Sequence, residues 1–595
     1  MRTHKNNELK KEQIGDKVTL VGWVSTRRDH GGIIFIDLRD RYGITQIVFD
    51  PEFNSNFMKI ADTLRREDCI KISGEVKPRK EGMENLKLPT GAIEVFIDDL
   101  KIINKSEVPP IDVDDRMEAG EDLRLKYRYL DLRRPSMQAK LAFRHKVVST
   151  ARNFLNSKDF LEIETPLLVK STPEGARDYV VPSRVNAGKF YALPQSPQLY
   201  KQLLMVAGCD RYYQIARCLR DEDLRADRQP EHTQIDLEMS FMTSDEIRSM
   251  IEGLIQNLFK ESMNIEIQTP FVKLSYKDSM TKYGTDKPDI RFELELTQVT
   301  DIVAKSDFGV FKDVKDNGGI IKCINPKKEL GRKEIDKYID FCQKNGAKGM
   351  AWMRVTENGL ESNIAKFFPE DVQKELIEKI NAKPGSILMF IADKEKKCND
   401  ILAKLRVKLA EDMGLLDDKN FVFSWIYDFP LFVYSEEEKR WVPEHHMFSM
   451  PKEEFVGDFE KRPAEVLGDL WDLALNGTEI GSGSIRISNP EIQRRVMNLV
   501  GFPEEKANER FGFLLEAYKY GGPNHGGMGL GLDRLVAIMK GTTDIREVIA
   551  FPKNKNAECP MDGSPGVIEE KQLKELHLEL DAAAKKNIEK ASKEQ

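Results

Sequence analysis

The sequence predicts an α+β protein in which a small N-terminal β-barrel precedes a larger domain of antiparallel strands and helices. Three features lead to this class. Residues 1–104 contain about five short strand-like runs separated by turns. Residues 217–241 contain two alternating runs joined by a polar, arginine-rich loop, which is typical of two antiparallel strands. Residues 287–420 alternate between helical and strand-like segments, a pattern that differs from that of the residues on either side.

Composition favours a folded chain of several domains. Its 595 residues suffice for about four domains, and 40% of them are hydrophobic and 32% charged. No run approaches the roughly 18 apolar residues of a membrane helix, and the first residues lack the apolar stretch of a signal peptide. The seven cysteines are scattered and form no CxxC pair, so we expect neither zinc nor disulfides and a reducing, cytoplasmic compartment. The net charge of -7 does not indicate nucleic-acid binding, although a local basic patch can still steer RNA.

Residues 1–104 are typical of an OB-type barrel, because several short strands must close on themselves within a small domain. In the second run, alternation places Phe35 on the polar face together with Asp37 and Arg39. An aromatic ring on that face, close to Arg27 and Arg28, is what a base-stacking platform needs. The residues alone leave a second interpretation open, in which Phe35 is covered by a loop or a neighbouring domain.

Composition and periodicity also predict the segments that follow the barrel. A helix is predicted around residues 147–155, and a strand over 160–165 ends at Pro166, since proline cannot donate to a strand ladder. The charged tail is predicted to form a solvated surface helix. The full division is a barrel at 1–104, a linker at 105–140, the two parts of the larger domain at 141–286 and 421–556, an insertion at 287–420 and a C-terminal extension at 557–595.

Two arginines are the strongest chemical signal. Arg220 follows the first of the two alternating runs, and the segment Gly529–Leu535 places small glycines beside Arg534 at the start of an apolar helix. Guanidinium groups offer planar, paired donors to phosphate oxygens, so two of them suit a triphosphate. The alternative for each arginine is a surface salt bridge. The rival nucleotide signatures, GxxxxGK[ST] and a strand–GxGxxG–helix unit, do not occur.

Taken together, these segments resemble the class II aminoacyl-tRNA synthetases, and the residues around them are most similar to the bacterial aspartyl branch. The helix, strand and Pro166 match motif 1, Arg220-Asp221-Glu222 match motif 2, and residues 529–534 match motif 3. The resemblance covers the whole chain, including the insertion. It implies an OB-fold anticodon-binding domain, a mainly antiparallel catalytic sheet and a homodimer.

The resemblance also implies a two-step reaction with ATP and Mg²⁺. Aspartate attacks the α-phosphate of ATP, and the aspartyl group then passes to the 3′ end of a tRNA. Arg220, Glu222 and Arg534 would be the catalytic residues, and Asp472 and Glu479 would hold magnesium. The ATP-binding set would be Arg220, Asp221, Glu222, Gln229, His232, Glu479, Gly531, Leu532, Asp533 and Arg534.

Aspartate needs donors for its side-chain carboxylate and an acid for its ammonium group. By resemblance Arg486 and Lys201 would supply the donors and Asp236 the acid, and we expect His445 rather than the neighbouring, core-packed His446 to contact the substrate. The aspartate-binding set would be Glu174, Ser196, Gln198, Lys201, Arg220, Asp236, His445 and Arg486. Two departures from the family pattern stand out: His232 replaces a stacking Phe, and Ser482 interrupts a stretch that is usually all glycine.

The tRNA specificity depends on the barrel. The anticodon set implied by the resemblance is Arg27, Arg28, His30, Phe35, Gln46, Gly82 and Glu94. His30 and Gly82 resemble the non-discriminating form, which accepts tRNA(Asp) and tRNA(Asn) and works with an amidotransferase that converts the misacylated product. Alternatives are a strictly tRNA(Asp)-specific enzyme, an asparaginyl or lysyl relative, and a non-catalytic OB-fold RNA-binding protein.

Overall fold

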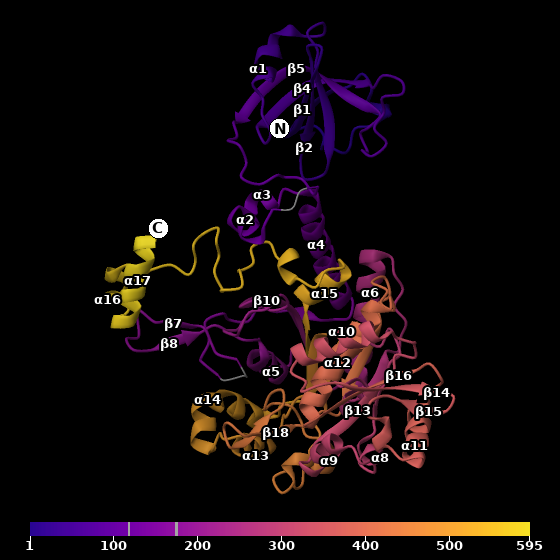
Figure 1. The fold of residues 1–595 in the computed structure, drawn as a ribbon. Coiled ribbons are helices and arrows are strands. Elements are labelled where there is room, and N and C mark those ends of the chain that lie inside the picture. The colour runs from indigo at the N-terminus through magenta and orange to yellow at the C-terminus, as the bar shows by residue number, and fades with distance from the viewer. Residues whose placement is uncertain (117–118, 173–175, 595) are drawn as a thin grey trace. The chain divides into compact units, whose positions relative to one another are not determined.

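The structure is a computed structural model that describes residues 1–116, 119–172 and 176–594 (Figure 1). The chain divides into two compact units. The first unit comprises Met1–His145, Leu224–Ala226 and Asp544–Ile568, and the second comprises Lys146–Asp223, Asp227–Thr543 and Glu569–Gln595. Within the described ranges, no helix is both long and apolar enough to cross a membrane.

The N-terminal residues form a closed five-stranded barrel, which confirms the predicted OB-type fold. The strand order is β1-β2-β3-β5-β4, in which only β3 and β5 pair in parallel. Alternating side chains such as Leu20, Ile36 and Ile47 fill its core. The elements are β1 (Lys17–His30), β2 (Ile33–Arg39), β3 (Ile44–Phe49), α1 (Met58–Asp62), β4 (Cys69–Pro78) and β5 (Ile93–Asn104).

The alternation in β2 follows the prediction except at its last residue. Phe35 and Asp37 lie on the outer face of the barrel, between buried neighbours. Arg39, which we expected beside them, is buried instead, and its Nη2 donates to Glu67 Oε2 at 2.7 Å. A buried carboxylate partner, which alternation cannot reveal, is what permits a guanidinium in this position.

A short linker follows the barrel. It contains the short helices α2 (Glu121–Lys126) and α3 (Arg128–Asp131). Arg128 is buried, and its guanidinium donates to the backbone carbonyls of Arg546, Ile549 and Ala550. Arg124 and Lys140 also pair with Glu547, at 2.9 Å and 2.6 Å, so several side chains of the linker hold the segment after residue 544.

The larger domain is built on an eight-stranded sheet of order β11-β17-β20-β21-β22-β10-β9-β6. All neighbours pair antiparallel except β11 with β17 and β6 with β9, so the expected mainly antiparallel sheet is confirmed. The strands are β6 (Leu161–Glu162), β9 (Arg211–Leu219), β10 (Glu231–Ser240), β11 (Val272–Ser275), β17 (Phe423–Tyr427), β20 (Leu470–Leu475), β21 (Thr478–Ile485) and β22 (His525–Gly531).

The strand predicted over residues 160–165 is wrong in length, because only Leu161 and Glu162 form β6. Beyond it, the backbone N–H of Thr165 donates to the side chain of Gln214 in β9 at 3.2 Å and not to the backbone of that strand. The chain thus leaves the sheet edge before Pro166.

Helices cover this sheet and end in recognisable caps. For example, Thr243 and Glu246 form a capping box at the start of α6, and Asn264 ends it in the left-handed conformation. Helices α5, α13 and α14 pack with β17 and β20 in one core. The helices are α4 (Pro135–Asn156), α5 (Gln198–Val206), α6 (Ser244–Met263), α7 (Tyr276–Tyr283), α13 (Pro490–Leu499), α14 (Glu504–Ala517) and α15 (Leu532–Met539).

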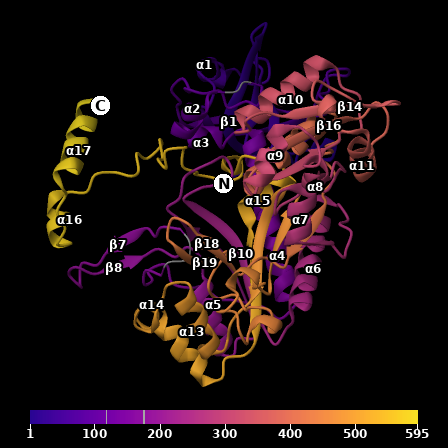
Figure 2. The same cartoon turned by 60° about the horizontal axis from the view of Figure 1, so that its bottom comes forward.

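Residues 287–420 contain a separate five-stranded antiparallel sheet with helices on both faces (Figure 2). In β16, Met389 faces α10 and α12, whereas Phe390 faces α8, α9 and α11. The sheet order is β12-β13-β16-β14-β15. The elements are β12 (Leu296–Gln298), α8 (Thr300–Val303), α9 (Gly309–Asp316), β13 (Ile320–Ile324), α10 (Arg332–Lys344), β14 (Ala351–Thr356), β15 (Gly359–Glu361), α11 (Glu370–Ile380), β16 (Ile387–Asp393) and α12 (Glu395–Asp412).

Two hairpins and a helical tail complete the second unit. They are β7 (Val180–Pro182) with β8 (Phe190–Ala192), β18 (Phe432–Ser435) with β19 (Arg440–Pro443), and α16 (Glu570–Glu575) with α17 (Ala582–Glu594). The tail is helical, as its composition predicted.

Candidate functional site

The site is built on one face of the eight-stranded sheet. Alternation along β10 places His232, Gln234, Asp236 and Glu238 on the same face. A row of cross-strand partners then runs from Asp236 through Gly529 and Ser482 to Asp472. Carboxylates from distant parts of the sequence therefore share one surface.

Glycines in β22 form the floor of this surface. A Cβ atom on Gly527 would lie 2.3 Å from Glu238 Oε2, and one on Gly529 would lie 2.8 Å from Gln234 Oε1. The side chains of β10 thus lean over the glycines, and a larger residue in β22 would displace them. This is the structural reason for the glycine-rich segment.

Four buried charges gather at one end of the site. Lys201 from α5 donates through Nζ to Asp236 Oδ1 at 2.7 Å and lies 3.3 Å from Glu238 Oε2. Arg486, just after β21, donates through Nε to Glu238 Oε1 at 2.9 Å. Burial alone would raise the pKa of Glu238, but the charges of Arg486 and Lys201 hold it at about 2. The cluster is two cations and two carboxyl groups enclosed in protein.

Two buried polar atoms on the elements that carry this cluster, β10 and α5, lack a partner among the described residues. Asp236 Oδ2 accepts no hydrogen bond, and Gln198 Nε2 donates none. Burial raises the pKa of Asp236, so its anionic form is short of compensation. Because buried polar atoms without partners are costly, a small ligand with an ammonium group and an acceptor oxygen would suit this place.

The guanidinium of Arg486 is held by further contacts. Its Nη1 donates to Ser484 Oγ at 2.6 Å and to His446 Nε2 at 2.9 Å, and its Nη2 donates to Gly527 O at 3.3 Å. Burial and the charge of Arg486 lower the pKa of His446 well below its usual value, so the neutral ring accepts this bond. His446 is partly exposed, not fully buried as expected for a core residue, and it orients Arg486.

Glu238 and His446 are site residues that the sequence reasoning missed. Glu238 lies two residues after Asp236 in an alternating strand, and that spacing could have placed it on the same face. No local pattern could have revealed the bond between His446 and Arg486, because it joins residues 40 positions apart.

A second cluster lies at the Asp472 end of the row. His445 Nε2 is 3.2 Å from Asp472 Oδ1. Burial would lower the pKa of His445, but the charge and hydrogen bond of Asp472 raise it to about 9. Burial and then the charge of Asp472 raise the pKa of Glu479. His445 is therefore cationic at neutral pH and lies between acidic neighbours.

The pair Asp472 and Glu479 fits a magnesium ion only together with a ligand. Within the described ranges, no group of three or more His, Cys, Asp or Glu side chains could hold a metal by itself. Magnesium in nucleotide sites commonly takes one or two carboxylates and completes its shell with phosphate oxygens and water. Burial and the charge of Asp472 raise the pKa of Glu479 although Arg534, Lys287 and His445 oppose the shift, so the nearby cations compensate the two carboxylates only in part.

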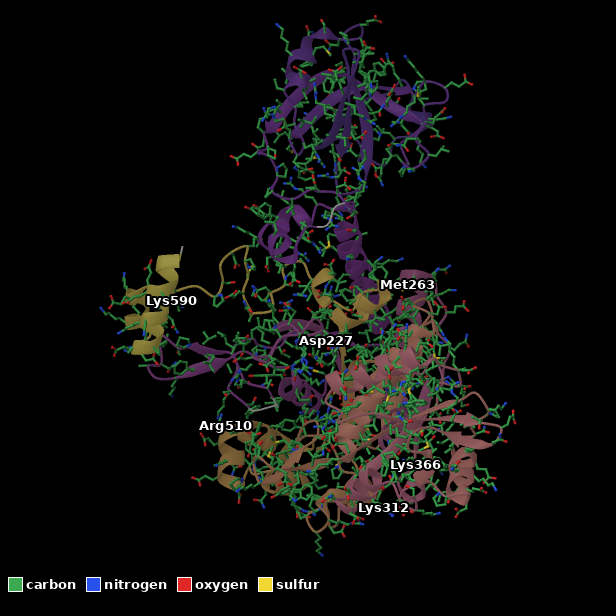
Figure 3. All side chains as sticks on the ribbon, viewed as in Figure 1. Asp227, Met263, Lys312, Lys366, Arg510 and Lys590 are labelled. Carbon is green, nitrogen blue, oxygen red and sulfur yellow. The ribbon has the colours of Figure 1, made fainter. Side chains whose placement is uncertain are left out.

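Arg220 and Arg534 converge on the same face. Burial and then the charges of Arg220 and Arg534 lower the pKa of His232 to about 3. Arg534 donates to Glu479 O at 3.0 Å and to Asp227 Oδ2 at 3.2 Å. Asp227 is labelled among the side chains in Figure 3. A neutral imidazole flanked by two guanidinium groups is suited to an aromatic ring that carries phosphates.

Most of the other residues predicted to bind ATP form contacts that stabilise the loops and strands of the site. Glu222 pairs with Arg228 at 3.1 Å, and Asp221 lies 3.5 Å from Arg177. Asp533 Oδ2 accepts from the backbone N–H of Thr233 at 2.8 Å, which joins α15 to β10. Gln229 and Leu532 are buried, and Gly531 ends β22.

The remaining residues predicted for aspartate lie around Gln195. Glu174 lies outside the described residues. After it in the chain, Ala176 and Asp178 both bond Gln195, whose Nε2 donates to Asp178 Oδ1 at 2.6 Å. Ser196 Oγ accepts from the backbone N–H of Gln198 at 3.3 Å. The start of α5 is therefore tied to the loop that precedes β7.

Most predicted anticodon residues share the outer face of the barrel. Arg28 donates to Asp37 at 3.0 Å and to Gln46 at 3.1 Å, and Gln46 donates to Glu94 at 2.7 Å. The ring of Phe35 lies next to this chain, since Phe35 pairs with Arg28 across β1 and β2.

Three other residues of the predicted anticodon set lie in different surroundings. His30 contacts Phe35 edge-on with centroids 5.9 Å apart. Gly82 has a φ of +79°, which favours glycine. Arg27 does not join Arg28: it pairs with Asp62 at 2.6 Å and lies opposite Ile36. Adjacent residues of a strand face opposite ways, which corrects the expectation that both arginines flank Phe35.

Comparison with known families agrees with this geometry. Residues 18–103 match a family described as OB-fold nucleic acid binding domain, and residues 120–555 match tRNA synthetases class II (D, K and N). The chain belongs to the class II tRNA synthetases. This class II synthetase is similar to proteins named aspartate–tRNA(Asp/Asn) ligase. It is 51% identical to that of Caldanaerobacter subterraneus subsp. tengcongensis, with 98% of each chain covered. It is 52% identical to that of Desulfatibacillum aliphaticivorans, with 97% of this chain and 98% of the relative covered.

Solved structures show the same fold. Asparaginyl-tRNA synthetase from Pyrococcus horikoshii, solved with asparaginyl-adenylate, superposes with a TM-score of 0.57 at 20% identity over 92% of this chain and 96% of the other. Aspartyl tRNA synthetase from Entamoeba histolytica gives a TM-score of 0.56 at 18% identity over 93% and 91%. At these identities the likeness concerns the fold of the class II synthetase and not its substrate.

Proposed function

We propose that this protein is an aspartate–tRNA ligase that charges both tRNA(Asp) and tRNA(Asn). The observation that carries the proposal is the enclosed cluster of Lys201, Arg486, Asp236 and Glu238 on the face that also holds Arg220 and Arg534. Such a cluster suits a small zwitterion with an acidic side chain, placed next to a triphosphate. The name shared by relatives at about 51% identity supports the same reaction.

The first step would join aspartate to the α-phosphate of ATP with loss of pyrophosphate. Arg220 would hold the α-phosphate beside the aspartate carboxylate, and Arg534 would hold the γ-phosphate. Such chemistry needs positioning and charge neutralisation and no protein nucleophile. Asp472 and Glu479 would hold a magnesium ion, which supplies further charge neutralisation for the phosphates. The ribose hydroxyl of the tRNA would then take the aspartyl group.

Selection of aspartate would follow from the paired charges. Asp236 Oδ2, which has no hydrogen-bond partner among the residues that the structure describes, would accept from the substrate ammonium group. Arg486 and Lys201 would donate to the side-chain carboxylate. Asparagine cannot supply that charge, and a buried cation left short of a partner costs several kcal/mol, so we expect strong discrimination.

Residues 1–104 would bind the anticodon through the outer face of the barrel, and residues 287–420 would form the inserted domain. The anticodons GUC and GUU differ only in their last base. His30 can donate or accept a hydrogen bond, and Gly82 has no side chain to enforce one base. Both features support acceptance of tRNA(Asn), and with it a partner amidotransferase.

We also propose a homodimer and a cytoplasmic location. Leu161, Leu167 and Leu168 are more than half exposed near the short edge strand β6, which fits a surface covered by a second copy. All seven cysteines are free, which fits a reducing compartment.

The decisive experiment is exchange of pyrophosphate into ATP without tRNA, with aspartate, asparagine or lysine in turn. We expect exchange with aspartate and magnesium alone. No exchange with aspartate, or faster exchange with either other amino acid, would reject the assignment. Charging of tRNA(Asp) and tRNA(Asn) transcripts side by side then tests the dual specificity.

A further inference from the structure

A second group of aromatic rings lies on the outer face of the barrel, apart from Phe35. The rings of Phe53 and Phe96 meet edge to face with centroids 5.5 Å apart. Lys77 Nζ lies 4.1 Å from the centroid of Phe53 and 4.5 Å from that of Phe96. Phe53 is 37% exposed and Phe96 is partly exposed.

The strand register connects these rings to Phe35. Phe35 pairs with Val48 across β2 and β3, and Val48 pairs with Phe96 across β3 and β5. Cross-strand partners point to the same face of a sheet, so Phe35 and Phe96 both point outward. Only β3 lies between their strands, and since neighbouring strands are about 4.8 Å apart, the two strands are about 10 Å apart.

A polar row runs beside the aromatic row. Asp37 pairs with Gln46, Gln46 donates to Glu94, and Glu94 pairs with Lys77. This row contains the hydrogen-bonding groups expected to read anticodon bases, and it ends at the second aromatic pair. An RNA strand bound along this polar row would therefore reach the rings of Phe53 and Phe96 at the end of the row.

The charge near Phe53 favours RNA over other partners. Lys77, Arg79 and Lys80 follow one another within four residues at the end of β4. In the described part of the chain Lys77 forms no ion pair, and its neighbour Glu94 already accepts from Gln46. Aromatic rings with nearby cations are the usual means of binding single-stranded nucleic acid, because every base has a face that stacks and every linkage carries a charge.

We propose that Phe53, Phe96 and Lys77 form a second base-stacking site, which takes a nucleobase immediately beside the anticodon triplet. The site rests on the proposed tRNA-ligase function, and it adds a contact outside the triplet. Lys77 would move from the rings to the RNA phosphate while the base stacks on Phe53. Neither group reads the identity of the base, so the site contributes affinity for the loop and not discrimination between tRNA(Asp) and tRNA(Asn).

The structure permits a clean test, because the loop that carries Phe53 is held by other contacts. The backbone N–H of Phe53 donates to Asp50 O at 3.1 Å, and Asn54 Nδ2 donates to Asp98 O at 3.2 Å. Replacement of Phe53 by alanine should therefore leave the loop in place. Tyr42 is the matched control: it is 39% exposed and has Lys5 Nζ 4.7 Å from its ring, but it lies in the turn between β2 and β3.

The experiment compares the full-length wild type with Phe53→Ala, Lys77→Gln and Tyr42→Ala. The Kd for a tRNA(Asp) transcript is measured together with the melting temperature and aspartate-dependent ATP exchange. We expect Phe53→Ala to raise the Kd about tenfold, and Lys77→Gln to reduce its salt dependence, with exchange unchanged. Tyr42→Ala should match the wild type. Phe53→Trp should restore binding, whereas Phe53→Leu should not, since leucine fills space without a stacking face.

A second measurement locates the base. Transcripts with 2-aminopurine on either side of the triplet should show quenching at one of the two positions on binding, and Phe53→Ala should remove it. Three outcomes would overturn the proposal: an unchanged Kd in Phe53→Ala, an equal loss of affinity in Tyr42→Ala, or a lower melting temperature of Phe53→Ala with no change in Kd. The rings of Phe53 and Phe96 would then form a packing contact or a protein-binding surface. If the wild type does not charge tRNA, the proposed function fails; Phe53-dependent binding of an isolated anticodon stem-loop would still support the site.

Discussion

The carboxylate of Asp227 lies 3.2 Å from Nη2 of Arg534, the arginine at the start of α15. The backbone carbonyl of Asp227 also accepts from Arg534 Nε at 3.5 Å. Arg534 is the residue proposed to hold the γ-phosphate of ATP. The loop between β9 and β10 therefore supplies Arg534 with an anionic partner that ATP must displace.

Replacement of Asp227 should strengthen the binding of ATP. Both partners are partly exposed, and exposed pairs contribute at most about 1 kcal/mol, so we expect Asp227→Ala to lower the KM for ATP by up to about fivefold in pyrophosphate exchange. Asp223→Ala, at an exposed position of the same loop, is the control and should leave this KM unchanged. A higher KM in Asp227→Ala would mean that Asp227 positions Arg534 for ATP.

Arg486→Leu should abolish aspartate activation and also weaken the fold. It leaves the buried Glu238 with only Lys201 at 3.3 Å, and removal of one partner of a buried pair typically costs about 3–5 kcal/mol. We expect the double variant Arg486→Leu/Glu238→Gln to recover most of the free energy of unfolding while remaining inactive. Denaturant unfolding and pyrophosphate exchange measure the two effects separately. Near-normal exchange in either variant would show that Arg486 is not the aspartate reader.

The stability of the ligand-free protein should depend on His445 in a defined pH range. Because the pKa of His445 rises from 6.5 to about 9 in the fold, its ion pair with Asp472 stabilises the protein fully below about pH 6.5. That contribution is lost as the pH rises through about 9. We expect the difference in urea midpoint between wild type and His445→Gln to be larger at about pH 6 than at about pH 9.5. A constant difference would contradict the paired, protonated histidine.

Phe35→Ala should weaken charging of tRNA and leave ATP exchange nearly unchanged. The loss of one base stack costs about 1–3 kcal/mol, which appears in kcat/KM for tRNA. The structure adds a contrast between two adjacent arginines. Arg28→Ala removes a donor from the chain with Gln46, whereas Arg27→Ala removes a pair with Asp62 on the other side, so only Arg28→Ala should resemble Phe35→Ala. Equal losses in charging and exchange would make Phe35 a structural residue.

Comparable kcat/KM values are expected for tRNA(Asp) and tRNA(Asn) transcripts. The relevant positions are His30, which lies edge-on to Phe35, and Gly82, whose positive φ accommodates a turn without a side chain. A preference for tRNA(Asp) of about a thousandfold or more would reject the dual specificity. Replacement of His30 by a bulkier or charged residue should increase the preference for tRNA(Asp) in the same assay.

Local features of this protein could be predicted from its residues alone. Period-two alternation predicted the barrel strands and the outward position of Phe35, and short motifs placed Arg220 after β9 and Arg534 at the start of α15. These features depend on a few neighbouring residues, which is why a single sequence is enough to find them.

The pairing of buried charges, by contrast, depends on how the chain folds in three dimensions. The pairs of Arg486 with Glu238 and of Asp227 with Arg534 join residues about 250 and 300 positions apart, and the burial of Arg39 depends on Glu67. Strand register places Asp236 and Asp472 on one face across the glycines of β22. Such contacts are set by the packing of strands and helices distant in the sequence, and local periodicity carries no information about them.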